Sequence, residues 1–355
     1  MEKTKKIVLL MHNGGRLGNQ LWWMAAFYAY CLEKGYFFDV RCFFEYQEYF
    51  NIKIESFGAR LCGKVYYFFE RVGFPKSILR DIFYGLYTLW SEIFAIIKSR
   101  CVIFDLDEIT QKTFRIFLYK RYKTMTRIAR NILLITLGLK KEEPFSYSTT
   151  HNLTLTLLPP STPVGPVISR NLRTYFYGWL FRNPAGIIKY QKEIREFFTP
   201  KLQIDSKINS YINHLRKSYK HVVGVHIRLG DAVNEYMNND KIAYSEEEVY
   251  TILKEYLVFS NNNVQDTCFV ICSDGVISES SFKGLNVMIT HNNPVEDLWL
   301  LSKTDSIIGA DSSFAITASL FGNIPFIVFK RGIDWVYYKD KKGFFVNKYV
   351  SRFIY

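Results

Sequence analysis

The sequence predicts an α/β fold made of two Rossmann-like domains that face a cleft, with a helical basic insertion in the N-terminal half. Three observations predict this fold class. A strand, a glycine-rich turn, a helix and a second strand follow one another at the N-terminus; strands and helices alternate regularly from Val222 onward; and a basic, aromatic segment separates the two regions. A chain of 355 residues, 48% hydrophobic, is long enough for two domains, which we expect at 1–165 and 166–355.

The N-terminal unit begins with a buried strand at Lys6–His12. The turn N-G-G-R-L-G-N-Q follows, apolar residues then recur at helical spacing as far as Gly35, and Tyr36–Cys42 is a second strand. The turn has neither the G-x-G-x-x-G pattern of dinucleotide sites nor the G-K-[ST] of a P-loop. Its glycines and the free amides at the helix start can still hold an anion or a sugar.

The insertion, at about 60–141, carries 16 basic and 6 acidic residues, a net charge of +10 out of the chain's +13. Within Phe114–Ile132, apolar side chains fall on one helical face and basic side chains occupy much of the remainder. One interpretation is a basic amphipathic helix lying on an anionic membrane surface. The other, which we prefer from sequence, is a helical insertion packed on the body with a solvated basic face.

The same segment contains Asp105-Leu-Asp107 after an apolar run. A D-x-D after a strand can hold a divalent cation on a diphosphate. It is more often an ordinary polar turn, and we expect no metal site in this protein.

Compartment signals are few. The apolar run near the N-terminus is too short for a signal peptide, and no window is long and apolar enough to span a bilayer. The six cysteines form no C-x-x-C pair and no zinc-ligand cluster, as in reduced cytoplasmic proteins. We expect a cytoplasmic protein, peripheral on the inner face of the membrane if the insertion binds lipid.

The C-terminal domain follows a Pro/Ser/Thr-rich linker at Phe145–Arg170, the segment Y-F-Y-G-W and an amphipathic helix at Ile187–Phe198. Ser245 and Glu248 form a capping box for a helix that runs to about Phe259. The remaining predicted elements are strands at Val222–Ile227, Thr267–Cys272, Asn286–Ile289, Ser306–Gly309 and Pro325–Phe329, and helices at Val295–Lys303 and Ser312–Phe321.

The loop V-H-I-R-L-G-D carries the strongest chemical signal. His226 and Arg228 are two residues apart, so in an extended strand they project to the same side, at the carboxyl end where open α/β sheets bind ligands. Gly230 permits a sharp turn, and Asp231 adds a carboxylate. The alternative is a strand that ends in a solvated Arg–Asp pair, with His226 as a core residue.

Two further loops reach the same sheet edge. One is S-D-G, which contains Asp274, and the other is A-D-S-S-F, which contains Ser312, Ser313 and Phe314 at the start of a helix. Free amides and hydroxyls at that helix N-terminus suit a phosphate or a ribose. Asp311 would repel a nearby phosphate, so we expect a ribose or base contact there.

Taken together, these motifs resemble the α-1,2-fucosyltransferases of glycosyltransferase family 11. The resemblance covers most of the chain: R-L-G-N-Q-L, Y-F-Y-G-W with I-R-E-F-F, V-H-I-R-L-G-D, V-I-C-S-D and A-D-S-S-F-A-I-T-A-S-L-F-G-N-I-P, in this order. It implies a GT-B architecture, with the acceptor on the N-terminal domain and the nucleotide sugar on the C-terminal one. It also implies an inverting transfer of L-fucose from GDP-fucose, without a metal or other cofactor, to the 2-hydroxyl of a terminal galactoside in a cell-surface or O-antigen glycan, lipid-linked in some cases.

The resemblance also implies the site residues. The family's H-x-R-R-x-D motif maps onto His226, Arg228, Leu229 and Asp231. We expect Arg228 to neutralise the leaving diphosphate, and either Asp231 or His226 to be the general base. The expected donor-binding residues are Gly15, Gly18, Asn19, Gln20, Asp274, Ser312, Ser313 and Phe314, with Asn19 and Gln20 assigned to the donor or acceptor sugar.

Three departures from the family pattern leave the donor and acceptor open. Leu229 stands where the second Arg is usual, Asp311 where Asn is common, and Ile316 and Thr317 replace the usual tryptophans. A related transferase that uses another nucleotide sugar is therefore the nearest alternative. A basic nucleic-acid-binding protein is a more distant one, because the excess charge lies in the insertion and leaves the three loops unexplained, and we expect no nucleic-acid partner.

Overall fold

The computed structural model describes residues 6–9, 16–40, 43, 45–54, 57–74, 79, 83, 173–176, 183–229, 244–345 and 347–350. The chain forms two compact units. The first consists of Met1–Arg16, Trp23–Tyr190 and Tyr355, and the second of Leu17–Trp22 and Gln191–Ile354. The units divide after Tyr190, whereas the sequence predicts a domain boundary after residue 165.

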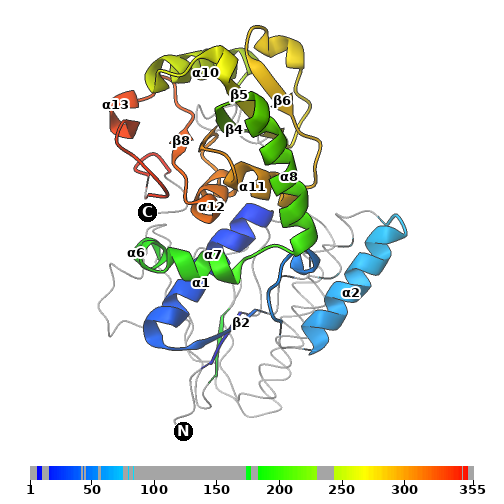
Figure 1. The fold of residues 1–355 in the computed structure, drawn as a ribbon. Coiled ribbons are helices and arrows are strands. Elements are labelled where there is room, and N and C mark those ends of the chain that lie inside the picture. Colours follow the sequence, from blue (N-terminus) through cyan, green and yellow to red (C-terminus); the bar gives the residue numbers. More distant parts are fainter. Residues whose placement is uncertain are drawn as a thin grey trace. The chain divides into compact units, whose positions relative to one another are not determined.

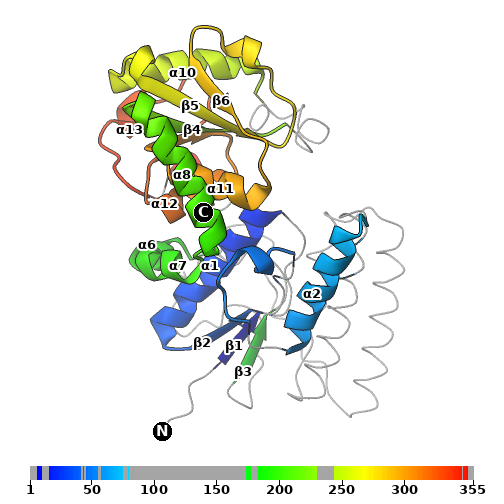
Figure 2. The ribbon, with the colours of Figure 1, turned by 45° about the vertical axis from the view of Figure 1, so that its right-hand side comes forward.

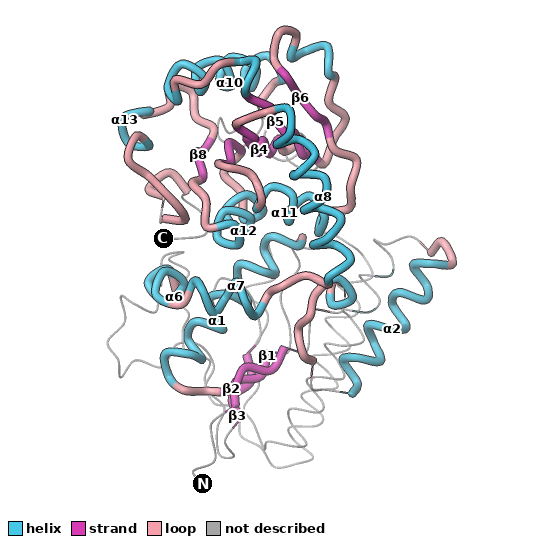
Figure 3. Tube along the Cα trace, viewed as in Figure 1, coloured by secondary structure: helices cyan, strands magenta, loops and turns pink. Residues whose placement is uncertain are grey.

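The first unit contains a three-stranded parallel sheet in the order β2-β1-β3. Its strands are β1 (Lys6–Leu9), β2 (Phe37–Val40) and β3 (Arg173–Phe176). They are the magenta tubes labelled β1, β2 and β3 in Figure 3. Helix α1 (Leu17–Lys34) connects β1 to β2 and ends where Gly35 adopts left-handed backbone angles, φ 64° and ψ 32°, that glycine accepts without strain. The predicted succession of strand, helix and strand is confirmed, and the predicted turn at residues 10–15 lies outside the described residues.

The remaining described elements of this unit are η1 (Gln47–Tyr49), α2 (Phe57–Arg71) and α6 (Pro184–Lys189). Helix α2 includes the first residues of the predicted basic insertion. The rest of the insertion, with its amphipathic stretch and its D-x-D, lies outside the described residues, as does the Pro-rich linker.

The single helix predicted at Ile187–Phe198 is wrong. The structure has two helices there, α6 and α7 (Gln191–Phe197), separated at Tyr190. Helix α6 starts earlier than predicted because Asn183 caps it, its Oδ1 accepting the Gly186 amide at 2.9 Å, and because proline is well suited to the first helical turn. The break coincides with the division between the two units.

The second unit contains a five-stranded, fully parallel sheet in the order β6-β5-β4-β7-β8. Figure 1 labels β4, β5, β6 and β8 of this sheet, and Figure 2 shows β4, β5 and β6 side by side. The strands are β4 (His221–Ile227), β5 (Thr267–Ser273), β6 (Asn286–Ile289), β7 (Ser306–Gly309) and β8 (Phe326–Val328). All five match strands predicted from the sequence, and the predicted α/β class is confirmed. The chain runs outward from β4 through β5 to β6 and then returns to β7 on the other side of β4. The strand order therefore reverses between β4 and β7, which is where open parallel sheets place their ligand crevice.

Helices cover both faces of this sheet. They are α7, α8 (Leu202–Ser218), α10 (Glu246–Ser260), α11 (Pro294–Ser302), α12 (Ser313–Gly322) and α13 (Trp335–Tyr338), with η3 (Val264–Asp266) and η4 (Glu279–Phe282) between strands. Val223, Val225 and Ile227 of β4 point into a core shared with α10. The alternate residues face α11 and α12: a Cβ on Gly224 would lie 2.8 Å from Leu301 Cδ2. Strand β4 is buried on both faces, as its unbroken apolar run predicts.

Helices α10 and α8 both carry clear local sequence signals, but only α10 was predicted. The predicted capping box of α10 is confirmed, because Ser245 Oγ accepts the Glu248 amide at 3.2 Å and Glu248 Oε2 accepts the Ser245 amide at 2.9 Å. Helix α8 was not predicted. Its signal was present, since Ile204, Ile208, Ile212 and Leu215 recur at helical spacing and form its buried face.

Candidate active site

The carboxyl ends of β4, β5 and β7 lie level with one another in the second unit. His226 pairs in register with Cys272 of β5 and with Gly309 of β7. The three predicted loops, which follow Ile227, Ser273 and Gly309, therefore leave the sheet from one edge and meet at the switch point between β4 and β7. The structure thus brings together, from the predicted set, His226, Arg228, Asp274, Ser312, Ser313 and Phe314.

His226 is buried, with 7% of its surface exposed, and contacts the start of α12 in two ways. Its Nδ1 lies 3.2 Å from Ser312 Oγ, and its ring stacks on Phe314 with the ring centroids 5.0 Å apart. Burial lowers the pKa of His226 from 6.5 to about 4; the positive charge of Arg228 acts in the same direction, and Asp274 opposes it. The imidazole is therefore neutral near pH 7.

The start of α12 is a set of buried polar groups. Ser312 caps the helix by accepting the Ala315 amide at 3.2 Å, and Asp311, Ser312 and Ser313 are each less than a tenth exposed. Because Ser312 Oγ already accepts one hydrogen bond, its own proton is available for His226 Nδ1. When Ser312 donates to Nδ1, the imidazole carries its proton on Nε2, where it can donate to a ligand oxygen.

The first turn of α1 packs directly on this helix start, and both belong to the second unit. A Cβ on Gly18 would lie 2.5 Å from the Phe314 amide nitrogen, so only glycine fits this approach. Asn19 Oδ1 accepts a hydrogen bond from Ser313 Oγ, and Thr317 Oγ1 donates to Gly18 O at 3.4 Å. Gln20, next along the helix, is 1% exposed.

These contacts give the predicted N-terminal residues a specific place. Gly18 and Asn19 touch the loop predicted to bind nucleotide, through Phe314 and Ser313. The R-L-G-N-Q motif thus positions the A-D-S-S-F motif, although nearly 300 residues separate them in sequence.

Leu229, which stands where the resembled family has a second Arg, packs against the loop after β5. A Cβ on Gly275 would lie 2.7 Å from Leu229 Cβ, and the Leu229 side chain also packs on the core shared by β4 and α10. The Leu229 amide donates to Asp274 Oδ1 at 2.8 Å. One oxygen of Asp274 thus joins the β4 and β5 loops, a role that the sequence alone did not predict.

Two further residues of this region were not predicted to contribute. Thr317, noted from the sequence only as a departure from the resembled family, is fully buried and donates to Ser313 O at 2.6 Å as well as to Gly18 O. Asp297 of α11 is 7% exposed and accepts from Thr290 Oγ1 at 2.8 Å and Asn292 Nδ2 at 3.3 Å. Burial raises the pKa of this carboxyl group. The sequence signal that could have identified Asp297 was a carboxylate on the apolar face of a predicted helix, because buried carboxylates are rare.

Some predicted residues cannot be placed. Gly15 and Asp231 lie outside the described residues, as do Asp105 and Asp107. In the part of the chain that the structure describes, no three His, Cys, Asp or Glu side chains are grouped so as to hold a metal ion. Over the same residues, no helix has the length and apolarity needed to cross a membrane.

Comparison with known proteins gives a likeness at the level of whole structures only. No protein-family model matches the chain, and neither does any curated protein sequence. Among solved structures, the fucosyltransferase NodZ from Bradyrhizobium matches at 13% identity with a TM-score of 0.48, covering 92% of this chain and 96% of NodZ.

Two other fucosyltransferases match in a similar way. POFUT1 in complex with GDP-fucose has 12% identity and a TM-score of 0.46, covering 91% of this chain and 97% of POFUT1. A mutant of Arabidopsis thaliana FUT1 in complex with GDP has 10% identity and a TM-score of 0.45, covering 94% of this chain and 72% of FUT1. At these values the likeness assigns no activity, so we derive the function from the site and the motifs.

Proposed function

We propose that this protein is an inverting glycosyltransferase that moves L-fucose from GDP-fucose to a hydroxyl of a glycan, namely the 2-hydroxyl of a terminal galactoside. The observation that carries the proposal is the meeting of three loops at the switch point, where a neutral His226, the buried hydroxyls at the start of α12 and the strand end bearing Arg228 come together. The donor and the linkage are those that the resemblance of the motifs to glycosyltransferase family 11 implies.

In the proposed reaction, the bond between the sugar C1 and the diphosphate oxygen breaks as the acceptor oxygen forms a bond to the opposite face of C1. Negative charge develops on the leaving diphosphate, and the Arg228 guanidinium offsets it where a preorganised cation helps most. The amides at the start of α12 favour the same anion.

The acceptor hydroxyl must lose its proton to a general base. His226 suits this role poorly, because it is buried, its ring stacks on Phe314 and its Nδ1 already lies within hydrogen-bonding distance of Ser312 Oγ. We therefore assign the base to Asp231 on sequence grounds. His226 is then the residue that orients the start of α12 and offers an Nε2 proton to the nucleotide.

Leu229 supports a second candidate, a transferase of the same mechanism that uses another nucleotide sugar. The resembled family has a second arginine at this position, whereas here an apolar side chain packs on Gly275. The preference of the enzyme for one nucleobase and one sugar in the donor can be measured directly.

A thermal-shift screen over nucleotide sugars tests both candidates. A ligand present at a hundred times its dissociation constant stabilises the folded protein by about 2.7 kcal/mol. We expect GDP-fucose and GDP to raise the melting temperature and UDP- and CMP-sugars to leave it unchanged. A shift with a different nucleotide sugar alone would select the second candidate, and no shift with any nucleotide would overturn the proposal.

Turnover then tests the linkage. With GDP-fucose and a terminal β-galactoside, we expect GDP release and a product whose NMR spectrum shows an α-fucosyl residue on the 2-hydroxyl. Hydrolysis of GDP-fucose without transfer would contradict the proposed acceptor class.

A further inference from the structure

The C-terminal segment that follows β8 is strongly basic. Residues 330–350 contain six Lys or Arg and two Asp, and Lys330, Lys341 and Lys348 are exposed. This segment lies in the second unit and is separate from the basic insertion in the first. Its charge therefore requires its own explanation.

The segment is held against the edge of the sheet. Tyr338 Oη accepts the outward-facing Val328 amide at 3.2 Å, and Asn347 Nδ2 donates to the Phe326 carbonyl at 2.8 Å, so the outer backbone groups of the edge strand β8 are satisfied by side chains. Both Tyr338 and Asn347 are buried. The lysines are thus carried on a fixed scaffold.

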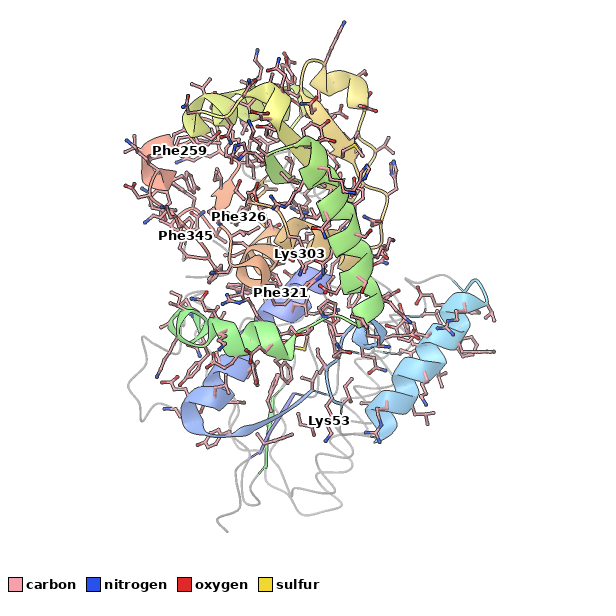
Figure 4. The ribbon with its side chains drawn as sticks, in the orientation of Figure 1. Lys53, Phe259, Lys303, Phe321, Phe326 and Phe345 are labelled. Carbon is pink, nitrogen blue, oxygen red and sulfur yellow. The ribbon has the colours of Figure 1, made fainter. Side chains whose placement is uncertain are left out.

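Three lysines of this segment lie over aromatic rings. We define the lysine–tyrosine surface as Lys330, Lys341, Lys348, Tyr337, Phe345 and Tyr349. Phe345 is labelled in Figure 4. Lys348 Nζ lies 4.2 Å from the Tyr337 ring centroid and 4.9 Å from that of Tyr349. Lys341 Nζ lies 5.1 Å from the Tyr337 centroid, and Lys330 Nζ 4.5 Å from that of Tyr349. All are within cation–π range.

The ammonium groups are close enough to repel one another. Lys348 shares the Tyr337 ring with Lys341 and the Tyr349 ring with Lys330. The Nζ atom of Lys348 therefore lies within about 10 Å of the Nζ atoms of both other lysines, and 10 Å is about one Debye length at 0.1 M salt. Asp334 Oδ2 pairs with Lys348 at 3.2 Å. In the part of the chain that the structure describes, Lys330 and Lys341 pair with no carboxylate, so an external anion would relieve their repulsion.

The same segment carries an exposed apolar side chain. Val336, next to Tyr337 in α13, is 83% exposed. Lys339 and Lys342 are also exposed on the same segment. A soluble anion would leave Val336 in water, whereas the interfacial layer of a bilayer would bury it while its headgroups met the lysines.

We propose that the lysine–tyrosine surface and Val336 bind the anionic headgroup layer of a lipid membrane. The partner is a bilayer that contains anionic phospholipid, and the contact is peripheral and electrostatic. This surface differs from the membrane contact considered for residues 60–141, and it does not depend on the proposed transferase activity.

Flotation of the full-length protein with vesicles tests the proposal. Phosphatidylcholine vesicles that contain phosphatidylserine should bind the protein at low salt and release it at high salt, and pure phosphatidylcholine should not bind it. Replacing all three lysines (Lys330→Gln, Lys341→Gln, Lys348→Gln) should lower the partition coefficient on the order of a hundredfold, since each lysine near an anionic surface contributes several-fold. Val336→Ser should lower it further.

Two matched variants control for charge and for folding. Removing three exposed lysines elsewhere in the second unit (Lys192→Gln, Lys217→Gln, Lys283→Gln) should leave binding within a few-fold of the parent. The Lys→Arg triple at 330, 341 and 348 keeps the charges and should retain binding. Equal losses in the two Gln triples would overturn the proposal, because binding would then follow net charge alone. Equal capture by heparin beads and vesicles, with Val336→Ser silent, would also overturn it by pointing to a soluble polyanion.

Discussion

Arg228 follows the buried strand β4 directly and places a planar cation just beyond its carboxyl end. Its neighbour two residues back, His226, is neutral, and its next neighbour, Leu229, is apolar and packed on Gly275. The diphosphate of a bound donor would therefore depend on Arg228 more than in a site with two adjacent arginines.

Arg228→Ala should lower turnover by on the order of a hundred- to a thousandfold, the usual loss when one transition-state donor is removed. Arg228→Lys keeps the charge but not the fork that grips two phosphate oxygens, so it should also lose most activity. Steady-state kinetics with GDP-fucose measure both. Arg216→Ala, which breaks an exposed ion pair with Asp305, is the control and should leave turnover unchanged. Near-normal transfer by a folded Arg228→Ala enzyme would show that the active site is placed wrongly.

His226 should make stability depend on pH. Its folded pKa, about 4, lies below its ordinary value of 6.5, so the unfolded chain binds more protons between these two values. The stabilisation from a neutral His226 is fully present above pH 6.5 and is lost as the pH falls toward 4, by roughly 3 kcal/mol in total. Urea unfolding from pH 7 to pH 4.5 measures this slope. The slope should be shallower in His226→Gln, and an identical slope in both proteins would contradict the assignment.

At the scale of elements, the unusual feature is the packing of two helix starts. The first turn of α1 meets the first turn of α12 through Gly18, Asn19 and Thr317, with no room for a side chain at Gly18. Helix propensity and packing therefore make opposite predictions for the effect of Gly18→Ala on stability.

Gly18→Ala should destabilise the protein. Propensity alone would stabilise α1 by about 1 kcal/mol. The new Cβ, however, would lie 2.5 Å from a backbone nitrogen that cannot move without displacing α12, so the free energy of unfolding should fall and nucleotide affinity should fall with it. Asn19→Ala should weaken nucleotide binding as well, by releasing Ser313. Glu33→Ala, at the exposed end of α1, is the control and should change stability by less than about 0.5 kcal/mol. An increase in stability in Gly18→Ala would show that the two helix starts are not held together.

For the molecule as a whole, the described site offers a guanidinium, a helix start and hydroxyl groups for a diphosphate. We therefore expect transfer to continue in EDTA with most of its turnover. Manganese or magnesium should not increase the rate. Full loss of turnover in EDTA, restored by either cation, would move the assignment to a metal-dependent transferase and draw attention to Asp105 and Asp107.

Much of this fold could be predicted because its signals are local. The unbroken apolar run of β4, the capping box of α10 and the alternation of strands and helices each depend on neighbouring residues, and the structure has all of them. Prediction from local signals missed the break between α6 and α7 at Tyr190, and it missed helix α8. The sequence also predicted which loops meet, since parallel strands bring their carboxyl ends to one edge.

Only the tertiary structure decided what these residues do to one another. Burial, with the charge of Arg228 acting in the same direction, lowers the pKa of His226 and makes it neutral, and desolvation is a property of surroundings that no motif contains. Gly18 and Asn19 hold the start of α12, and Leu229 packs on Gly275, because folding closes distances that sequence spacing does not encode. The sequence by itself determined the α/β class and which three loops leave the sheet from one edge; the packing between distant segments decided the charge of His226 and the partners of the loop residues.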